Sequence, residues 1–138
     1  MIVRRAQAGE IAACAALYER VLRATFTWIP PERHQGADFI AAAQDEEVYL
    51  AADGERLLGV ASLYRPDSFL HSLYVEARGL GVGKALLDHV ADGADGPLHL
   101  KCQVPNTRAQ AFYAREGFRI VEKGHEPGFS VGWIRISR

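Results

Sequence analysis

The sequence predicts an α/β fold, in which helices pack on one mixed (α+β) sheet. Three observations predict this class. Apolar β-type runs separated by turn residues fill 47–75, residues 9–25 have the spacing of an amphipathic helix, and a glycine-rich turn joins a strand to a helix near 76–92. The expected order is β-α-α-β-β-β-α-β-α-β-β. Neither an all-α bundle nor a doubly wound parallel sheet would contain the long run of strands at 47–75.

The first third of the chain is expected to hold one short strand, at 2–5, and two helices. The first helix, 9–25, has an apolar face made of Ile11, Cys14, Tyr18, Val21, Leu22 and Thr25. Pro30 and Pro31 separate the two helices, because proline cannot continue a helix but can begin one. The second helix is therefore expected over 31–43.

The rest of the chain predicts antiparallel hairpins around a central β-α-β unit. In order, the expected elements are a hairpin over 47–65 that turns at Asp53-Gly54, a strand at 68–75, a helix at 81–92, a strand within 97–105, a helix at 106–115, and strands near 118–123 and 129–137.

Length, charge and hydropathy limit the number of domains and the kinds of partner that this chain is expected to have. A chain of 138 residues is expected to form one domain, 1–138. Its net charge of -1 offers no basic surface for a nucleic-acid backbone. It has neither a signal peptide nor 18 consecutive apolar residues, so a cytoplasmic protein without a membrane partner is expected. Cys14 and Cys102 form no metal-type cluster, which predicts free thiols and no metal.

The segment "ARGLGVGKA" (77–85) has the composition of a phosphate-binding loop, but it matches neither common nucleotide loop. The triphosphate pattern G-x-x-x-x-G-K-[ST] fails because Arg78 and Ala85 replace its first glycine and its hydroxyl. The dinucleotide pattern G-x-G-x-x-G fails in both registers, because Lys84 and Leu86 stand where its last glycine should be.

The pattern that remains is R-x-x-G-x-G, made by Arg78, Gly81 and Gly83 between a strand and a helix. Glycines allow close approach of the backbone to a ligand, and the first N–H groups of a helix attract anions. Arg78 and Lys84 add positive charge beside those groups. The alternative is a tight strand-to-helix turn that binds nothing, since short glycine motifs are weak evidence.

A second motif follows one strand later. "NTRAQAFYAREGFR" (106–119) has the form N-x-x-A-x-x-x-Y-x-x-x-G-F. With both motifs in this order, the chain resembles the GNAT superfamily of acyl-CoA-dependent N-acyltransferases over essentially its whole length. The resemblance implies a GNAT-type fold with a splayed central strand pair. It further implies an N-acetyltransferase that moves an acetyl group from acetyl-CoA to a primary amine of a small molecule or peptide, by direct attack in a ternary complex. A homodimer is compatible with it.

The resemblance also implies a cofactor site. The implied residues are Leu73, Tyr74, Val75, Arg78, Gly79, Leu80, Gly81, Val82, Gly83, Lys84, Asn106, Ala109, Phe112 and Tyr113. Within this set, the loop would bind the pyrophosphate and Tyr113 would give a proton to the leaving thiolate. Asn106 is equally well explained as a helix N-cap, and Phe112 as a core side chain.

The proton acceptor and the acceptor pocket are less well specified. His71 is the best candidate base, because strand alternation places it on the same side as Leu73 and Val75 and imidazole titrates near neutral pH. Glu32, His34 and a water relay are alternatives. Trp28, Glu32 and His34 are the candidate substrate-binding residues.

Three further points stay open from the residues. Cys102 is interpreted as a packing thiol rather than an acyl carrier. A catalytically weak acyl-CoA sensor on the same fold is the rival function, with an O-acyltransferase as a further option. One departure from the family pattern is the short turn Glu76-Ala77: either the turn is unusually tight, or the preceding strand ends near Leu73.

Overall fold

The computed structural model describes residues 1–33, 35–128 and 131–138. Within them the order of strands and α-helices is the one expected from the sequence. Its elements are β1 (Ile2–Arg5), α1 (Ile11–Thr25), α2 (Gly36–Ala43), β2 (Glu47–Asp53), β3 (Arg56–Tyr64), β4 (Phe69–Val75), α3 (Val82–Gly93), β5 (His99–Gln103), α4 (Thr107–Arg115), β6 (Arg119–His125) and β7 (Gly132–Ser137). Short 3-10 turns at Ala8–Glu10, Pro31–Arg33 and Arg65–Asp67 join some of them.

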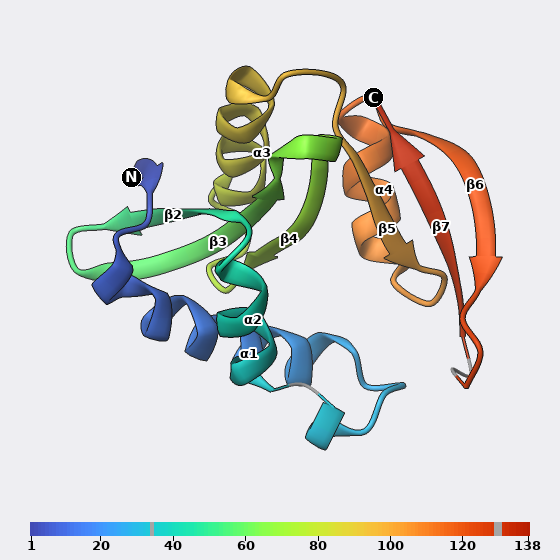
Figure 1. The fold of residues 1–138 in the computed structure, drawn as a ribbon, viewed down its shortest axis with the longest axis horizontal. Helices are drawn as coiled ribbons and strands as arrows, with labels where there is room; N and C mark the ends of the chain where they lie inside the picture. The colour runs from blue at the N-terminus through green and yellow to red at the C-terminus, as the bar shows by residue number, and fades with distance from the viewer. Residues whose placement is uncertain (34, 129–130) are drawn as a thin grey trace.

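The strands form one mixed sheet in the order β1-β2-β3-β4-β5-β7-β6. Among the described strands the parallel pair is β4–β5, which is connected through α3, and the other neighbours in this order are antiparallel. This is the expected central β-α-β unit between antiparallel strands. In Figure 1 the sheet opens between β4 and β5, so that β5, β6 and β7 form a separate wing.

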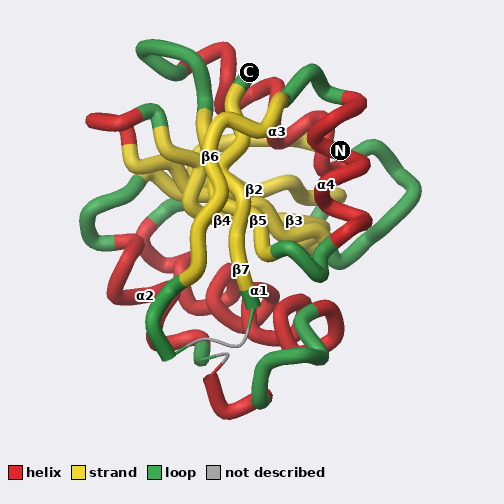
Figure 2. Tube along the Cα trace, turned by 90° about the vertical axis from the view of Figure 1, so that its right-hand side faces the viewer, coloured by secondary structure: helices red, strands yellow, loops and turns green. Residues whose placement is uncertain are grey.

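Helices cover both faces of the sheet (Figure 2). On one face α1 and α2 bury Cys14, Leu17 and Phe39 against Val48, Leu50 and Val60 of β2 and β3. On the other face α3 and α4 contribute Leu86, Leu87, Val90 and Tyr113 to a larger core with Leu58, Leu63, Leu70 and Ile134. None of the helices in the described ranges is long and apolar enough to cross a membrane.

The expected single helix over 31–43 is wrong. Pro31–Arg33 form a short 3-10 turn, and α2 begins only at Gly36. The cause is Gln35, which is extended (φ -108°, ψ 129°) and therefore cannot continue a helical turn. The N-terminus of α2 is capped by a side chain of α1, because the Gly36 N–H donates to Oε2 of Glu19 at 2.8 Å. His34 lies outside the described residues.

The central strand pair is splayed, as the resemblance implies. Strand β4 pairs with β3 from Gly59↔Val75 to Tyr64↔Phe69, but it pairs with β5 only at Phe69↔His99. Strand β4 continues to Val75, so the tight-turn interpretation of Glu76-Ala77 is confirmed and a strand end near Leu73 is wrong. The carbonyl of Leu58 holds this turn, accepting from the N–H of Glu76 at 2.9 Å and of Ala77 at 3.3 Å.

Gly59 sets how closely α3 packs on the sheet beside the split. A Cβ at this position would lie 3.0 Å from Val82, 3.1 Å from Leu86 and 3.1 Å from the backbone oxygen of Tyr74. We expect Gly59→Ala to lower the free energy of unfolding by about 1–3 kcal/mol, because the buried neighbours must shift. Urea unfolding measures this change.

Gly93→Ala is the matched control, since a Cβ at the end of α3 would meet nothing within 4 Å. Its free energy of unfolding should equal or slightly exceed that of the wild type. Equal stabilities for the two variants would show that Gly59 is not needed for close packing.

Candidate functional site

A cavity of about 570 Å³ lies where β4 and β5 part. The end of α1, the second half of β4, the glycine-rich turn with the start of α3, and α4 surround it. Its lining residues are Val21, Thr25, Phe26, Leu73, Tyr74, Val75, Ala77, Arg78, Gly79, Gly81, Val82, Gly83, Lys84, Asn106, Arg108, Ala109, Phe112, Tyr113 and Arg115. The structure therefore brings together every residue of the expected cofactor set except Leu80, whose side chain is 62% exposed.

The glycine-rich turn presents backbone donors to this cavity. Gly79 (φ 79°) and Gly81 (φ 74°) have left-handed backbones that other residues adopt only with strain. Gly81 is the N-cap of α3, and the first helical bond runs from the N–H of Ala85 to its carbonyl at 3.1 Å. The N–H groups of 82–84 precede that bond and have no partner within the helix. They form a small region of positive potential at the cavity wall.

Cationic side chains on three segments surround these donors. Arg78, Arg108 and Arg115 line the cavity, and Arg78 also donates to the Thr25 hydroxyl at 3.4 Å. Lys84 differs from the sequence expectation, because Glu116 at 2.8 Å and Asp88 at 3.4 Å already neutralise its ammonium group. The hydrogen bond to Glu116 raises the pKa of Lys84. Most of the uncompensated charge therefore comes from the arginines.

Strand β4 forms the second wall. Its Tyr74 ring lies edge-on to Tyr18, with the centroids 5.4 Å apart, and close to Phe26. Burial raises the pKa of the Tyr74 phenol. Just beyond the strand, Arg20 of α1 donates twice to the Glu76 carboxylate, at 2.7 Å and 3.0 Å, and lowers its pKa. This pair ties α1 to the turn that precedes the glycines.

Helix α4 supplies the third wall. Asn106 is its N-cap, accepting from the Ala109 N–H at 3.3 Å, and it also lines the cavity. Tyr113 is 7% exposed and lies between Phe112 and Phe118, with ring centroids 5.1 Å and 5.3 Å away. Burial raises the pKa of its phenol, so Tyr113 stays protonated throughout the neutral range.

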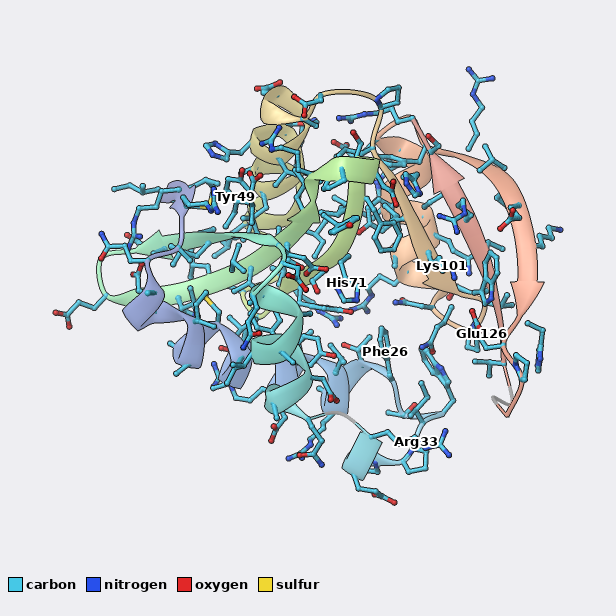
Figure 3. The ribbon with its side chains drawn as sticks, in the orientation of Figure 1. Phe26, Arg33, Tyr49, His71, Lys101 and Glu126 are labelled. Carbon is cyan, nitrogen blue, oxygen red and sulfur yellow. The ribbon has the colours of Figure 1, made fainter. Side chains whose placement is uncertain are left out.

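Two of the expected acceptor residues, Trp28 and Glu32, do not line this cavity. The indole N–H of Trp28 donates to Oε1 of Gln103 at 2.5 Å, so the segment after α1 reaches across to β5. Glu32 is exposed on the 3-10 turn. In Figure 3, Phe26, His71, Lys101 and Glu126 are seen around the open side of the split sheet. His34 cannot be placed, because it is outside the described residues.

On the side of the opening formed by β5, β6 and β7, the side chains are polar and aromatic. Lys101 of β5 places its ammonium group 4.4 Å from the ring centroid of Trp133 and 3.4 Å from the carboxylate of Glu126. The Trp133 ring in turn covers Gly124 of the neighbouring strand, where any Cβ would overlap it. The wing therefore offers a cation, a carboxylate and an aromatic face together.

His71 is exposed and does not line the cavity, and the expected alternation is wrong at this residue. The register passes from Ser62↔Ser72 to Leu63↔Leu70, so His71 is an extra residue in β4. Leu73 and Val75 pack on the α3 side, whereas the ring of His71 contacts the Glu46 carboxylate that precedes β2. A β-bulge leaves no mark in the residue pattern of a single strand.

Cys102 supports the packing interpretation. It is 5% exposed, and its Sγ lies 3.7 Å and 3.8 Å from the carbonyl oxygens of Gln103 and Asn106. Burial raises the pKa of the thiol to about 11, which makes it a weak nucleophile at neutral pH. Among the described residues, no three His, Cys, Asp or Glu side chains are grouped to hold a metal ion.

Sequence reasoning missed three charged residues of this region. Arg108 and Arg115 are seven residues apart, two turns of one helix, and that spacing was a usable signal for a shared face. Glu46 had no such signal, because its contact with His71 joins residues 25 apart through the sheet.

The family follows from comparison of the whole chain. The family model described as acetyltransferase (GNAT) family matches residues 11–118, which include the glycine-rich turn, β4 and α4. This chain belongs to the GNAT acetyltransferase family. The sequence-based recognition is confirmed, and the cavity is the part of this GNAT domain in which both sequence motifs meet.

Solved structures have the same fold. YjaB from Escherichia coli, in its apo form, is 19% identical with a TM-score of 0.78 over 99% of this chain and 97% of its own. Ribosomal-protein-alanine N-acetyltransferase from Brucella melitensis is 20% identical with a TM-score of 0.72, over 100% and 99% of the two chains. YncA from Salmonella typhimurium, solved with acetyl-CoA, is 18% identical with a TM-score of 0.72, over 100% and 92%. Among curated protein sequences none matches this GNAT domain.

Proposed function

We propose that this GNAT acetyltransferase transfers an acetyl group from acetyl-CoA to a primary amine of a small molecule or peptide. The observation that carries the proposal is the cavity itself. It joins the amide donors of α3, the free edge of β4 and the buried phenol of Tyr113 in one continuous space. The structure of YncA with acetyl-CoA supports the choice of acyl donor.

The turn and its arginines fit a pyrophosphate. Residues 82–84 at the start of α3 and Arg78 of the preceding turn line the cavity, and Arg108 and Arg115 add charge from α4. Backbone donors at a helix N-terminus and guanidinium groups are the two protein elements that suit phosphate oxygens best. These residues would hold the nucleotide end of acetyl-CoA.

The parted strands fit an extended polar chain. Beyond Phe69↔His99 the described residues of β4 have no strand partner on the β5 side, so backbone N–H and C=O groups face the cavity. Buried backbone groups require hydrogen-bond partners, and the amides of a pantetheine arm can supply them. Acetyl-CoA would bring a thioester carbonyl, whose acetyl group is transferred to the acceptor nitrogen.

Tyr113 would donate a hydrogen bond to the sulfur that leaves. Its raised phenol pKa keeps the proton in place before and after reaction, so stabilisation of the thiolate by O–H···S is favoured over complete proton transfer. The thiol of CoA has a lower pKa than the buried phenol, which points in the same direction.

Incubation with acetyl-CoA and a panel of small amines and peptides tests the function. We expect release of free CoA thiol that depends on the amine, together with mass spectra in which the amine gains one acetyl group. Tight binding of acetyl-CoA without turnover of any amine would contradict the proposed acetyltransferase activity. It would favour the rival function, an acyl-CoA sensor.

Removal of the phenolic oxygen tests Tyr113. We expect Tyr113→Phe to lower kcat about 10–1,000-fold with little change in acetyl-CoA affinity, because the lost hydrogen bond acts on the leaving sulfur. Tyr64→Phe is the matched control, since Tyr64 is exposed and does not line the cavity. Unchanged kcat for Tyr113→Phe, measured where chemistry limits the rate, would exclude this role.

Titration calorimetry tests the phosphate site. Arg78→Ala should weaken acetyl-CoA binding about tenfold, because a charge-assisted hydrogen bond to phosphate is lost. Lys84→Ala should weaken it less, since Glu116 and Asp88 already neutralise that side chain. Arg119→Ala on the exposed strand β6 controls for net charge. If Arg119→Ala and Arg78→Ala weakened acetyl-CoA binding equally, the effect of Arg78 would come from net charge and not from a specific phosphate site.

A further inference from the structure

The extra residue in β4 places His71 at a defined point of the split sheet. Phe69 makes the last pair with β5, and Leu73 is the first β4 residue to line the cavity. His71 lies between these two positions, where the strands begin to part. Its ring stacks on Phe69, with centroids 5.9 Å apart and planes 28° apart.

The bulge also decides which face of the sheet His71 occupies. Leu70 and Leu73 both pack in the core beneath α3, although residues three apart in a regular strand point to opposite faces. The additional residue at 71 accounts for this reversal. His71 is therefore excluded from the α3 side and projects on the face that α1 and α2 leave open next to β5 (Figure 3).

Glu46 fixes the ring from one side. Its two carboxylate oxygens lie 2.8 Å and 3.1 Å from Nδ1 of His71. The carboxylate side chain is only 10% exposed, whereas the His71 side chain is 47% exposed. Within the described part of the chain, His71 is the one side-chain partner of Glu46, whereas the neighbouring Glu47 accepts from Arg65 and Tyr49. Ion pairs between two exposed side chains contribute little, whereas here the carboxylate partner is largely shielded from solvent.

A carboxylate can only accept hydrogen bonds, so its hydrogen bond with His71 requires that Nδ1 of the ring carries a proton. In the neutral ring the lone pair then belongs to Nε2, on the exposed side. We propose that Glu46 is a positioning residue that holds His71 as the Nδ1–H tautomer, so that Nε2 accepts the proton of the acceptor amine. This inference rests on the proposed acetyltransferase function.

The location suits that proton transfer. The glycine-rich turn follows Val75 at one end of β4, and His71 lies four residues, about 13 Å, back along the strand. A cofactor held by its phosphates at the turn and extended along β4 would bring its acyl end toward His71. The amine nitrogen bonds to the acetyl carbon and gives its proton to Nε2. The C–S bond then breaks, CoA leaves as the thiolate beside Tyr113, and the imidazolium returns its proton to solvent.

The tautomer can be observed without any turnover. Nitrogen-15 NMR of the imidazole rings, at a pH where they are neutral, should show His71 with its proton on Nδ1, assigned by the signal that His71→Asn removes. Glu46→Ala should move His71 toward the Nε2–H form that imidazole prefers in water. A wild-type His71 that is already Nε2–H, or one that Glu46→Ala does not change, would overturn the proposal.

A double-mutant cycle tests the catalytic consequence. We expect His71→Ala to lower kcat about 100-fold and Glu46→Ala about tenfold, with the KM for acetyl-CoA unchanged. In the His71→Ala background, Glu46→Ala should have no further effect, because it acts only through the ring. Asp45→Ala is the control, an exposed neighbour of the same charge. Additive losses from Glu46 and His71 would overturn the coupling.

Failure of a variant to fold, failure of the proposed function and failure of the Glu46 proposal can be told apart. If Glu46→Ala does not fold, as judged by circular dichroism, Glu46→Gln preserves the side-chain volume and takes its place in both experiments. If the wild type acetylates no amine, the proposed function fails while the tautomer measurement still decides the role of Glu46. If the wild type is active and neither substitution changes kcat, only this inference fails.

Discussion

The parting of β4 from β5 after one residue pair is the constraint on which the rest of this structure depends. A continuous sheet would satisfy both strand edges internally and leave no space between them. The early separation instead creates a cavity with unpaired backbone on one side and α4 on the other. Under the proposed function, a ligand that runs along β4 would restore the lost hydrogen bonds with its own amides.

Separate cores on the two faces of the sheet support the split between β4 and β5. The α1–α2 face and the α3–α4 face each bury their own apolar side chains, so the sheet does not need strand pairing at its centre for stability. Specific ties then fix the rim of the cavity. Arg20 holds Glu76, and the Leu58 carbonyl holds the tight turn that precedes the glycines. The helix N-terminus is presented at a fixed position as a result.

The electrostatics of the site arise from placement more than from the number of charged residues. Lys84 belongs to the recognisable motif, yet Glu116 neutralises it from the end of α4. Arg108 and Arg115 belong to no phosphate-binding pattern, yet they line the cavity. Similarly, burial keeps Tyr113 protonated and Cys102 unreactive, although both carry ionisable groups beside the parted strands. Charge and proton affinity here depend on neighbours that are distant in sequence.

The sequence alone determined the order of the elements, because each depends on local periodicity, on proline and glycine, and on caps such as Asn106. It also determined the family and most of the cavity lining, since both motifs are contiguous segments. It could not determine the break at Gln35, the bulge at His71 or the partner of Lys84. These features follow from strand register and from contacts between segments, whose energies depend on how distant parts of the chain pack. For that reason only the tertiary structure could bring Glu46 to His71 and set the face on which that ring projects.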